Sequence, residues 1–392
     1  RIVSLLVPIV NMAARSEQGA SVDVANKESE TFYVIYRCQI KTGSSDSDRN
    51  TDVSLTVLSS DLVSVYEVHL QKLVTQRLSK GAIYSGSGSI ISADLGIPGT
   101  TDGRSACYHC VIETDRNNPD GDVPSADKKK DKFVVCFLAN QELLLELFLV
   151  DLDRFALGVI KDFQQKKFHV DDATKRSIQR WYTVSVEYLS RCISLLKNNV
   201  KFLVHAALLD ATLSCRGCTN EQENDILRLF QSCSLSEILA QLKEVKQQQE
   251  NGSLSGSIDM LVDVGTGDNQ SDMQNIVVVD ITDSGVTFVP AGCTKFCEEW
   301  SKALNKPEFQ QNSVKLKQVI EAFKLKFIQT VNTLKRLLRE AENDFYALYR
   351  AYIFLRDSGN SNILLHYAKL ETSPNVASVV SVLDEFIREI GS

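Results

Sequence analysis

Two Cys-x-x-Cys pairs are the clearest candidates for chemistry in this sequence of 392 residues. Four thiolates can hold a zinc ion, and one pair can cycle between dithiol and disulfide. Residues 105–114, which contain Cys107 and Cys110, are predicted to form a strand, and residues three apart in a strand point to opposite faces. One zinc site that uses both this pair and the second pair, Cys215 and Cys218, is therefore disfavoured.

The second pair, in Cys-Arg-Gly-Cys at residues 215–218, lies between two predicted helices. Gly217 would allow the turn that a metal-binding knuckle needs, and a helix N-terminus would favour a reactive thiol. No thioredoxin-like βαβ pattern surrounds the pair. The simpler interpretation is that Gly217 ends a helix and that the cysteines act as small apolar residues, so no metal or cofactor is predicted.

Other catalytic patterns are incomplete. Residues 85–89 (SGSGS) could cradle a phosphate, but they lack the Lys-Ser/Thr ending of a P-loop and the full dinucleotide pattern, which favours a flexible loop. The five histidines are dispersed, and no Gly-x-Ser-x-Gly elbow is present. An enzyme with a dispersed active site stays open as an alternative.

Basic residues gather on the longest predicted helix, at residues 313–356. Four acids on the same helix and the lack of clearly interleaved exposed aromatic residues favour an ordinary solvated face. These cations could face an acidic partner, RNA or an anionic membrane, and nucleic-acid contact requires that they converge in space. The candidate interaction residues are Lys324, Lys326, Lys335, Arg336 and Arg339.

Bulk composition describes a folded chain with a sizeable core, 43% hydrophobic and 24% charged. A net charge of −7 argues against a dedicated nucleic-acid binder. Ten cysteines without framework spacing fit reduced thiols, which predicts a cytoplasmic or nuclear location. The apolar stretch 2–14 resembles a signal-peptide core, although a buried strand over residues 2–10 is favoured. Acids interrupt residues 143–160, so no transmembrane segment is predicted.

The first third of the chain predicts several strands around one helix. Alternating and β-branched residues predict strands at residues 31–40, 52–58, 105–114 and 132–138. Helical spacing predicts a helix at residues 61–78. The high Gly and Ser content of residues 82–103 predicts that much of this stretch has no regular secondary structure.

Helices dominate the rest. Apolar residues at steps of three and four predict two consecutive helices, joined as an antiparallel hairpin, over residues 140–213. Residues 313–356 carry a heptad seam that includes Phe345, Leu348, Tyr352 and Leu355, and this long helix should pack along the central pair. Shorter helices are predicted at 220–230, 235–246 and 375–390, and a β-hairpin at 258–281 that residues 286–289 extend.

Together these elements predict an α+β fold, with a mostly antiparallel sheet from the N-terminal third and the later hairpin, packed against a bundle of long antiparallel helices. Four regions are expected: a strand-rich region at 1–139, central helices at 140–246, a linker and hairpin at 247–311, and the C-terminal helices at 312–392. The hairpin could also form a small second sheet.

Long amphipathic helices without a coherent active site favour a non-catalytic scaffold or adaptor subunit that binds partner proteins in a larger intracellular assembly. Two alternatives remain open: the enzyme with a dispersed site, and a nucleic-acid-associated factor that uses the basic face of the late helix.

Overall fold

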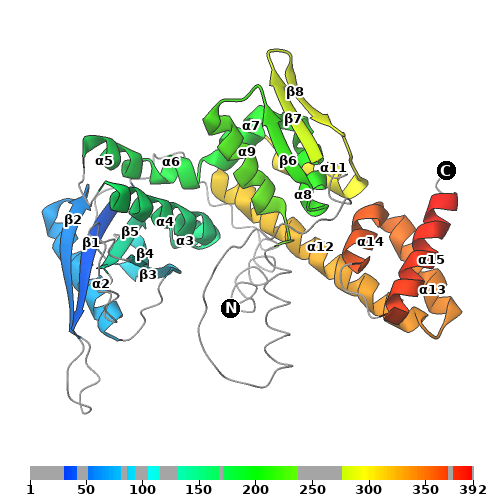
Figure 1. The fold of residues 1–392 in the computed structure, drawn as a ribbon, viewed down its shortest axis with the longest axis horizontal. Helices are drawn as coiled ribbons and strands as arrows, with labels where there is room; N and C mark the ends of the chain where they lie inside the picture. The colour runs from blue at the N-terminus through cyan, green and yellow to red at the C-terminus, as the bar shows by residue number, and fades with distance from the viewer. Residues whose placement is uncertain are drawn as a thin grey trace, which may run out of the picture. The chain divides into compact units, whose positions relative to one another are not determined.

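The computed structural model describes residues 31–41, 52–80, 86–93, 95, 105–114, 131–166, 171–236, 276–369 and 374–390. The described residues up to Glu187 form one compact unit, which we call the N-terminal unit (Figure 1). Those from Tyr188 onward form a second, the C-terminal unit. The predicted strands at 2–10 and 258–264 lie outside the described residues. The predicted boundaries at residues 139, 246 and 311 stay a prediction.

One antiparallel sheet of five strands organises the N-terminal unit, in the order β2-β1-β5-β4-β3. The four strands predicted from alternation are confirmed, and in β2 the side chains of Val53 and Leu55 are buried while Ser54 and Thr56 are exposed. β3, which lies in the stretch expected to be largely irregular, is held by its pairing with β4. The strands are β1 (Phe32–Lys41), β2 (Asp52–Ser60), β3 (Ser89–Ala93), β4 (Ser105–Thr114) and β5 (Asp131–Ala139).

Helices cover both faces of this sheet. On one face, α2 (Ser64–Ser79) buries Leu70, Val74 and Leu78 against strand residues that include Cys107 and Cys136. On the other, α3 (Glu142–Leu147) and α4 (Leu149–Gln165) pack on β4. There Phe137 of β5 stacks on Trp181 of α6 (Trp181–Ser185), with ring centroids 5.1 Å apart. The core therefore lies on both sides of the sheet.

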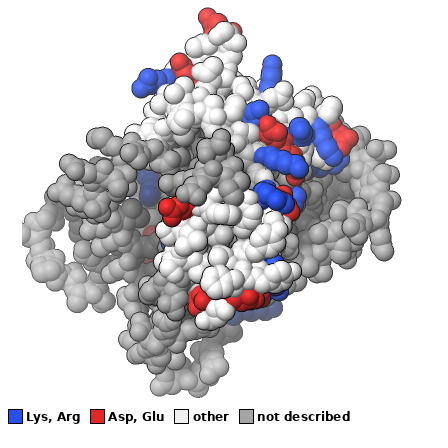
Figure 2. Space-filling view, turned by 90° about the vertical axis from the view of Figure 1, so that its right-hand side faces the viewer, with Lys and Arg blue, Asp and Glu red and all other residues white. Residues whose placement is uncertain are grey.

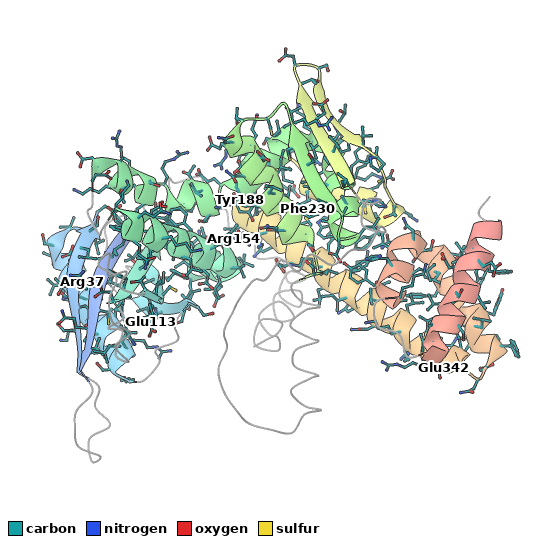
Figure 3. All side chains as sticks on the ribbon, in the orientation of Figure 1. Arg37, Glu113, Arg154, Tyr188, Phe230 and Glu342 are labelled. Carbon is teal, nitrogen blue, oxygen red and sulfur yellow. The ribbon has the colours of Figure 1, made fainter. Side chains whose placement is uncertain are left out.

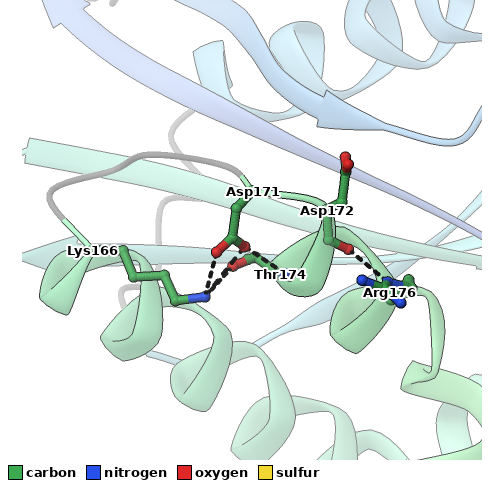
Figure 4. Close-up of polar contacts among 5 residues, drawn as sticks. All are labelled: Lys166, Asp171, Asp172, Thr174 and Arg176. Carbon is green, nitrogen blue, oxygen red and sulfur yellow. Dashed lines mark hydrogen bonds and ion pairs between the residues drawn. The ribbon is translucent and has the colours of Figure 1, made fainter.

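Acids open the helix α5 (Asp172–Gln179), where they suit the positive end of the helix dipole. Asp171 is its N-cap and accepts a hydrogen bond of 2.7 Å from the Thr174 amide. The Lys166 ammonium, at the end of α4, lies 3.2 Å from the Asp171 carboxylate and 2.6 Å from the Thr174 hydroxyl (Figure 4). Hydrogen bonds from Thr174, followed by that from Lys166, lower the pKa of Asp171.

The prediction of two long helices over residues 140–213 is wrong. A turn at Phe148 separates α3 from α4, and the Tyr182 carbonyl accepts from the amides of both Val186 and Glu187 where α6 ends. Each short helix can then turn its own apolar side toward a different neighbour, which accounts for the broad apolar content of this stretch. The second half continues in the C-terminal unit as α7 (Tyr188–Leu196), η2 (Lys197–Asn199), α8 (Val200–Leu208) and strand β6 (Thr212–Arg216).

A second, smaller sheet lies in the C-terminal unit. β7 (Ile276–Thr282) and β8 (Gly285–Val289) form an antiparallel hairpin, and β7 pairs in parallel with β6. Of the hairpin predicted at 258–281, the described part is the strand near 276–281, and it pairs with the predicted extension at 286–289. The hairpin therefore completes a three-stranded sheet of its own. The helix α9 (Asn220–Cys233) follows β6, begins with a capping box from Thr219 and Gln222, and packs on α7 and α8. The hydroxyl of Tyr188 in α7, a residue labelled in Figure 3, lies 2.8 Å from the Ser232 hydroxyl of α9.

The long helix α12 (Ser313–Ala341) is the spine of the C-terminal unit and contacts α7, α9 and α11 (Lys295–Leu304). The prediction that the late helix packs on the central helices is thus confirmed for α7. Further along, α12 contacts α13 (Phe345–Ser358), α14 (Ser361–Lys369) and α15 (Pro374–Ile390) (Figure 1).

The predicted single helix over residues 313–356 is interrupted at residues 342–344. Glu342, labelled in Figure 3, follows the end of α12, and Asp344 caps α13 by accepting a 2.8 Å hydrogen bond from the Tyr346 amide. An N-cap aspartate satisfies amides that a continuing helix would bond internally, which explains the break.

The fold is α+β, as the sequence predicts. Among the described residues, no helix combines the length and apolar character that a membrane span requires.

Candidate interaction surface

Aromatic and aliphatic side chains are exposed along α13 and α15. Phe345 is 91% exposed, Tyr346 67% and Tyr349 58%, which is far more than residues of this type usually show. Residues four and three apart share a helix face, so Phe345, Tyr349 and Tyr352 form one stripe. The Tyr352 ring meets that of Phe386 edge-on, with centroids 5.0 Å apart, and this contact joins the stripe to α15.

We call this area the α13–α15 surface. Its members are Phe345, Tyr346, Tyr349, Tyr352, Val382 and Phe386, of which Val382 is 54% exposed and Phe386 44%. The heptad spacing predicts a buried seam that includes Phe345 and Tyr352, and this prediction is wrong for both residues. The break before α13 resets the helical phase, so that α13 buries Ala347 and Ala351, and of the predicted seam residues in this helix it buries Leu355.

A groove beside this surface lies between α11, α12 and α13. Its volume is about 810 Å³, within the range of pockets that hold a small ligand or several side chains of a peptide. Aromatic and aliphatic side chains supply much of its lining, and Tyr346 and Tyr349 belong both to the groove and to the α13–α15 surface. The apolar lining residues are Phe296, Phe327, Leu337, Ile353 and Phe354.

Four cations also line the groove: Lys295, Lys326, Arg336 and Arg350. The Lys326 ammonium lies 3.6 Å from the Glu299 carboxylate and 5.8 Å from the centre of the Phe296 ring. Arg350 and Arg336 both approach Glu340, at 3.5 and 4.0 Å. The groove therefore combines an apolar lining with partly neutralised positive charge.

The five cations singled out from the sequence divide between different environments. Lys326 and Arg336 line the groove, whereas Lys324, Lys335 and Arg339 do not. Lys324 is only 13% exposed, pairs with Glu321 at 3.7 Å and lies near the buried Cys233 thiol, whose pKa burial raises to about 12. In the view of Figure 2, lysine and arginine side chains alternate with acids beside a broad uncharged area.

Cys107 and Cys110 are completely buried in β4. Cys107 belongs to the core beneath α2, whereas Cys110 is three residues on and faces the other side of the sheet, as predicted. Burial raises the pKa of Cys110 to about 12, so this thiol is held protonated.

Cys215 lies in strand β6 and not directly after a helix. Cys218 directly precedes Thr219, the N-cap of α9, and both cysteines are partly exposed. Gly217 between them has φ +69°, and a Cβ there would collide with the Ile281 carbonyl oxygen. Burial raises the pKa of Cys215 to about 11. Within the described parts of the chain, no three histidine, cysteine or acidic side chains are grouped as metal ligands.

The glycine-rich segment at residues 85–89 is described from Gly86 onward. Its amides are engaged within the fold: that of Gly86 donates to the Val111 carbonyl at 2.9 Å, and that of Gly88 donates to the Asp153 carboxylate at 2.8 Å. A carboxylate thus occupies the place that a phosphate would take at Gly88.

The arrangement nearest to a catalytic one joins the end of α8 to α14. The Ser234 hydroxyl donates to Asp210 at 3.2 Å, and burial lowers the pKa of His366 while nearby Asp210 opposes that shift. Nε2 of His366 has no hydrogen-bond partner among the described residues. None of these three residues lines the groove, and no described nucleophile is bonded to Nε2 of His366, so no triad is assembled among the described residues.

Comparisons with known proteins identify a family. Residues 36–389 match the model of the Njmu-R1-like protein family. The mouse (Mus musculus) Protein Njmu-R1 is 31% identical over 340 residues, which cover 86% of this chain and 81% of that protein. No solved structure matches the chain. The chain therefore belongs to the Njmu-R1-like protein family.

Proposed function

We propose that this protein is a non-catalytic scaffold or adaptor subunit of a larger intracellular assembly, and that it binds partner proteins through the α13–α15 surface. The exposure of Phe345, Tyr346 and Tyr349 is the observation that carries the proposal. Burying one such ring gains about 1.5–3 kcal/mol, so an aromatic surface left in water is a source of binding energy. Aromatic residues are also the commonest energetic anchors of protein interfaces.

Two observations weigh against the alternatives. A nucleic-acid-binding face needs a continuous positive field, whereas Lys326 pairs with Glu299 and Arg336 and Arg350 share Glu340. An enzyme needs aligned reacting groups in a cavity, whereas the lining of the groove does not include Ser234, Asp210 or His366.

The test compares two double variants of the full chain in gentle affinity purification. Phe345→Ser/Tyr349→Ser removes two aromatic anchors. Val65→Ser/Val68→Ser removes two apolar side chains from α2 that are equally exposed, at 63% and 62%. We expect partner proteins to be lost from the first variant and retained by the control, with both variants folded by circular dichroism. Unchanged partners in the first variant, or a chain that purifies alone, would contradict the proposal.

A further inference from the structure

We propose that the groove between α11, α12 and α13 binds an acidic, amphipathic helical segment of a partner protein. This inference rests on the proposed function and names the chemistry of the partner. The apolar residues of this partner segment would enter the groove, and its acidic residues would contact the cations of the groove lining.

Charge complementarity selects an acidic occupant. The chain as a whole carries −7, yet the groove lining holds four cations and two acids, Glu299 and Asp357. Each of those acids is already engaged, Glu299 with Lys326 at 3.6 Å and Asp357 with Arg356 at 2.9 Å. Glu340 offsets part of the charge of Arg336 and Arg350, and the lining keeps an excess of cations over acids in a protein that is acidic as a whole.

Arg336 and Arg350 are the best placed cations. Both guanidinium groups approach the single carboxylate of Glu340, at 4.0 and 3.5 Å, longer than the ~2.7–2.9 Å of a tight charge-assisted pair. A guanidinium has five N–H donors, so donors remain for a second carboxylate from a partner. For Lys295, no ion pair is formed with any other described residue.

Two threonines of the groove wall are engaged within their own helix. The Thr330 hydroxyl donates to the Lys326 carbonyl at 2.8 Å, and the Thr333 hydroxyl donates to the Gln329 carbonyl at 3.0 Å. These threonines therefore offer little hydrogen-bonding capacity to a ligand. The cations, together with apolar contact to residues such as Phe354 and Ile353, favour a peptide with acids between apolar positions over a nucleic acid.

The experiment selects binders to the full chain from a displayed library of random peptides of about 16 residues, long enough for four helical turns. Enriched peptides are then measured by fluorescence anisotropy against three proteins: the wild type, Arg336→Glu/Arg350→Glu, and Lys302→Glu/Arg339→Glu. The third is a matched control, because it reverses the same number of charges on α11 and α12 at exposed positions outside the groove.

We expect peptides with Asp or Glu between apolar residues at helical spacing. The affinity for these peptides should be at least ~10-fold lower in the groove variant, Arg336→Glu/Arg350→Glu, and should differ by less than ~2-fold in the control. Added salt should lower the affinity of the wild type. Selection of peptides without acids, or equal binding to the groove variant, would overturn the inference. The inference would also be overturned if the groove variant lost binding of a fluorescent single-stranded RNA while it kept binding of the peptides.

The same variants separate this inference from the proposed function. If partner proteins are lost from Phe345→Ser/Tyr349→Ser but remain on Arg336→Glu/Arg350→Glu, the acidic segment is excluded while the scaffold role stands. If neither variant loses a partner, both proposals fail.

Discussion

Arg191 of α7 and Asp225 of α9 form a two-pronged ion pair, with Nε and a terminal nitrogen of the guanidinium each 2.8 Å from a carboxylate oxygen. The Asp225 side chain is only 10% exposed. Arg191→Ala leaves that carboxylate poorly compensated, and we expect a loss of about 2–4 kcal/mol in unfolding free energy of the C-terminal unit. Arg191→Lys should restore only part of it, because an ammonium cannot match the two-pronged geometry.

The measurement is denaturant unfolding followed by tryptophan fluorescence. The chain has two tryptophans, Trp181 in the N-terminal unit and Trp300 in the C-terminal unit, so a Trp181→Phe background reports on the unit that contains Arg191. Arg339→Ala, at an exposed position of α12, is the control and should change stability by less than about 0.5 kcal/mol. Equal stability of Arg191→Ala and this control would refute the expectation.

Asp153 ties α4 to the start of β3 and to β4. Its carboxylate accepts hydrogen bonds from the Tyr108 hydroxyl at 2.7 Å and the Gly88 amide at 2.8 Å. Asp153→Ala removes this shared acceptor, and we expect a loss of about 1–3 kcal/mol in the N-terminal unit. A Trp300→Phe background leaves Trp181 as the reporter. The exposed Asp162→Ala on the same helix is the control, and a loss equal to that control would count against the role of Asp153.

His109 makes the N-terminal unit sensitive to acid. Burial, followed by the nearby charge of Arg77, lowers its pKa from 6.5 to about 4. As pH falls below 6.5, the unfolded chain takes up a proton that the folded chain refuses until about pH 4, so stability is lost across this window. We therefore expect this residue to contribute a loss of about 2 kcal/mol in unfolding free energy between pH 7 and pH 5.

The check is the difference in unfolding free energy between wild type and His109→Leu at pH 7 and pH 5. The variant should show a shallower loss, whatever its absolute stability. His69→Leu, at an exposed position of α2, should keep the wild-type slope. If the unfolding free energy of His109→Leu fell with pH as steeply as that of the wild type, His109 would not be the source of the acid sensitivity.

Gly217 is required by both its backbone conformation and its surroundings. Its φ is +69°, and a Cβ would collide with the Ile281 carbonyl oxygen of β7. Gly217→Ala should therefore destabilise the C-terminal unit by more than about 1 kcal/mol. The same substitution at Gly158, in helix α4 with open space around it, should stabilise the N-terminal unit by about 0.5–1 kcal/mol. Equal effects at the two positions would disprove this explanation.

Local patterns predict most of the N-terminal sheet but not its shortest strand. β1, β2, β4 and β5 contain β-branched, aromatic or alternating residues that specify a strand by themselves. β3 and β6 are five residues long and depend on their partners β4 and β7, so tertiary pairing decides them. Such pairing leaves little trace in a single sequence.

Of the candidate site, the sequence predicts only charged residues of the groove. Lys326 and Arg336 were singled out as interaction residues, and both line the groove. The exposed rings of α13 were missed, because a continuous apolar period through residues 342–344 assigns Phe345 and Tyr352 to a buried seam. The signal that could have found them is Asp344, an N-cap residue type directly before an apolar run.

Hydrogen exchange of the full chain, alone and with its co-purified partner proteins, is the sharpest test of partner binding at the α13–α15 surface. We expect partners to slow amide exchange in α13 and α15 and in the part of α12 that lines the groove, residues 326–337. Protection confined to the sheet of the N-terminal unit, with unchanged exchange in α13 and α15, would contradict it.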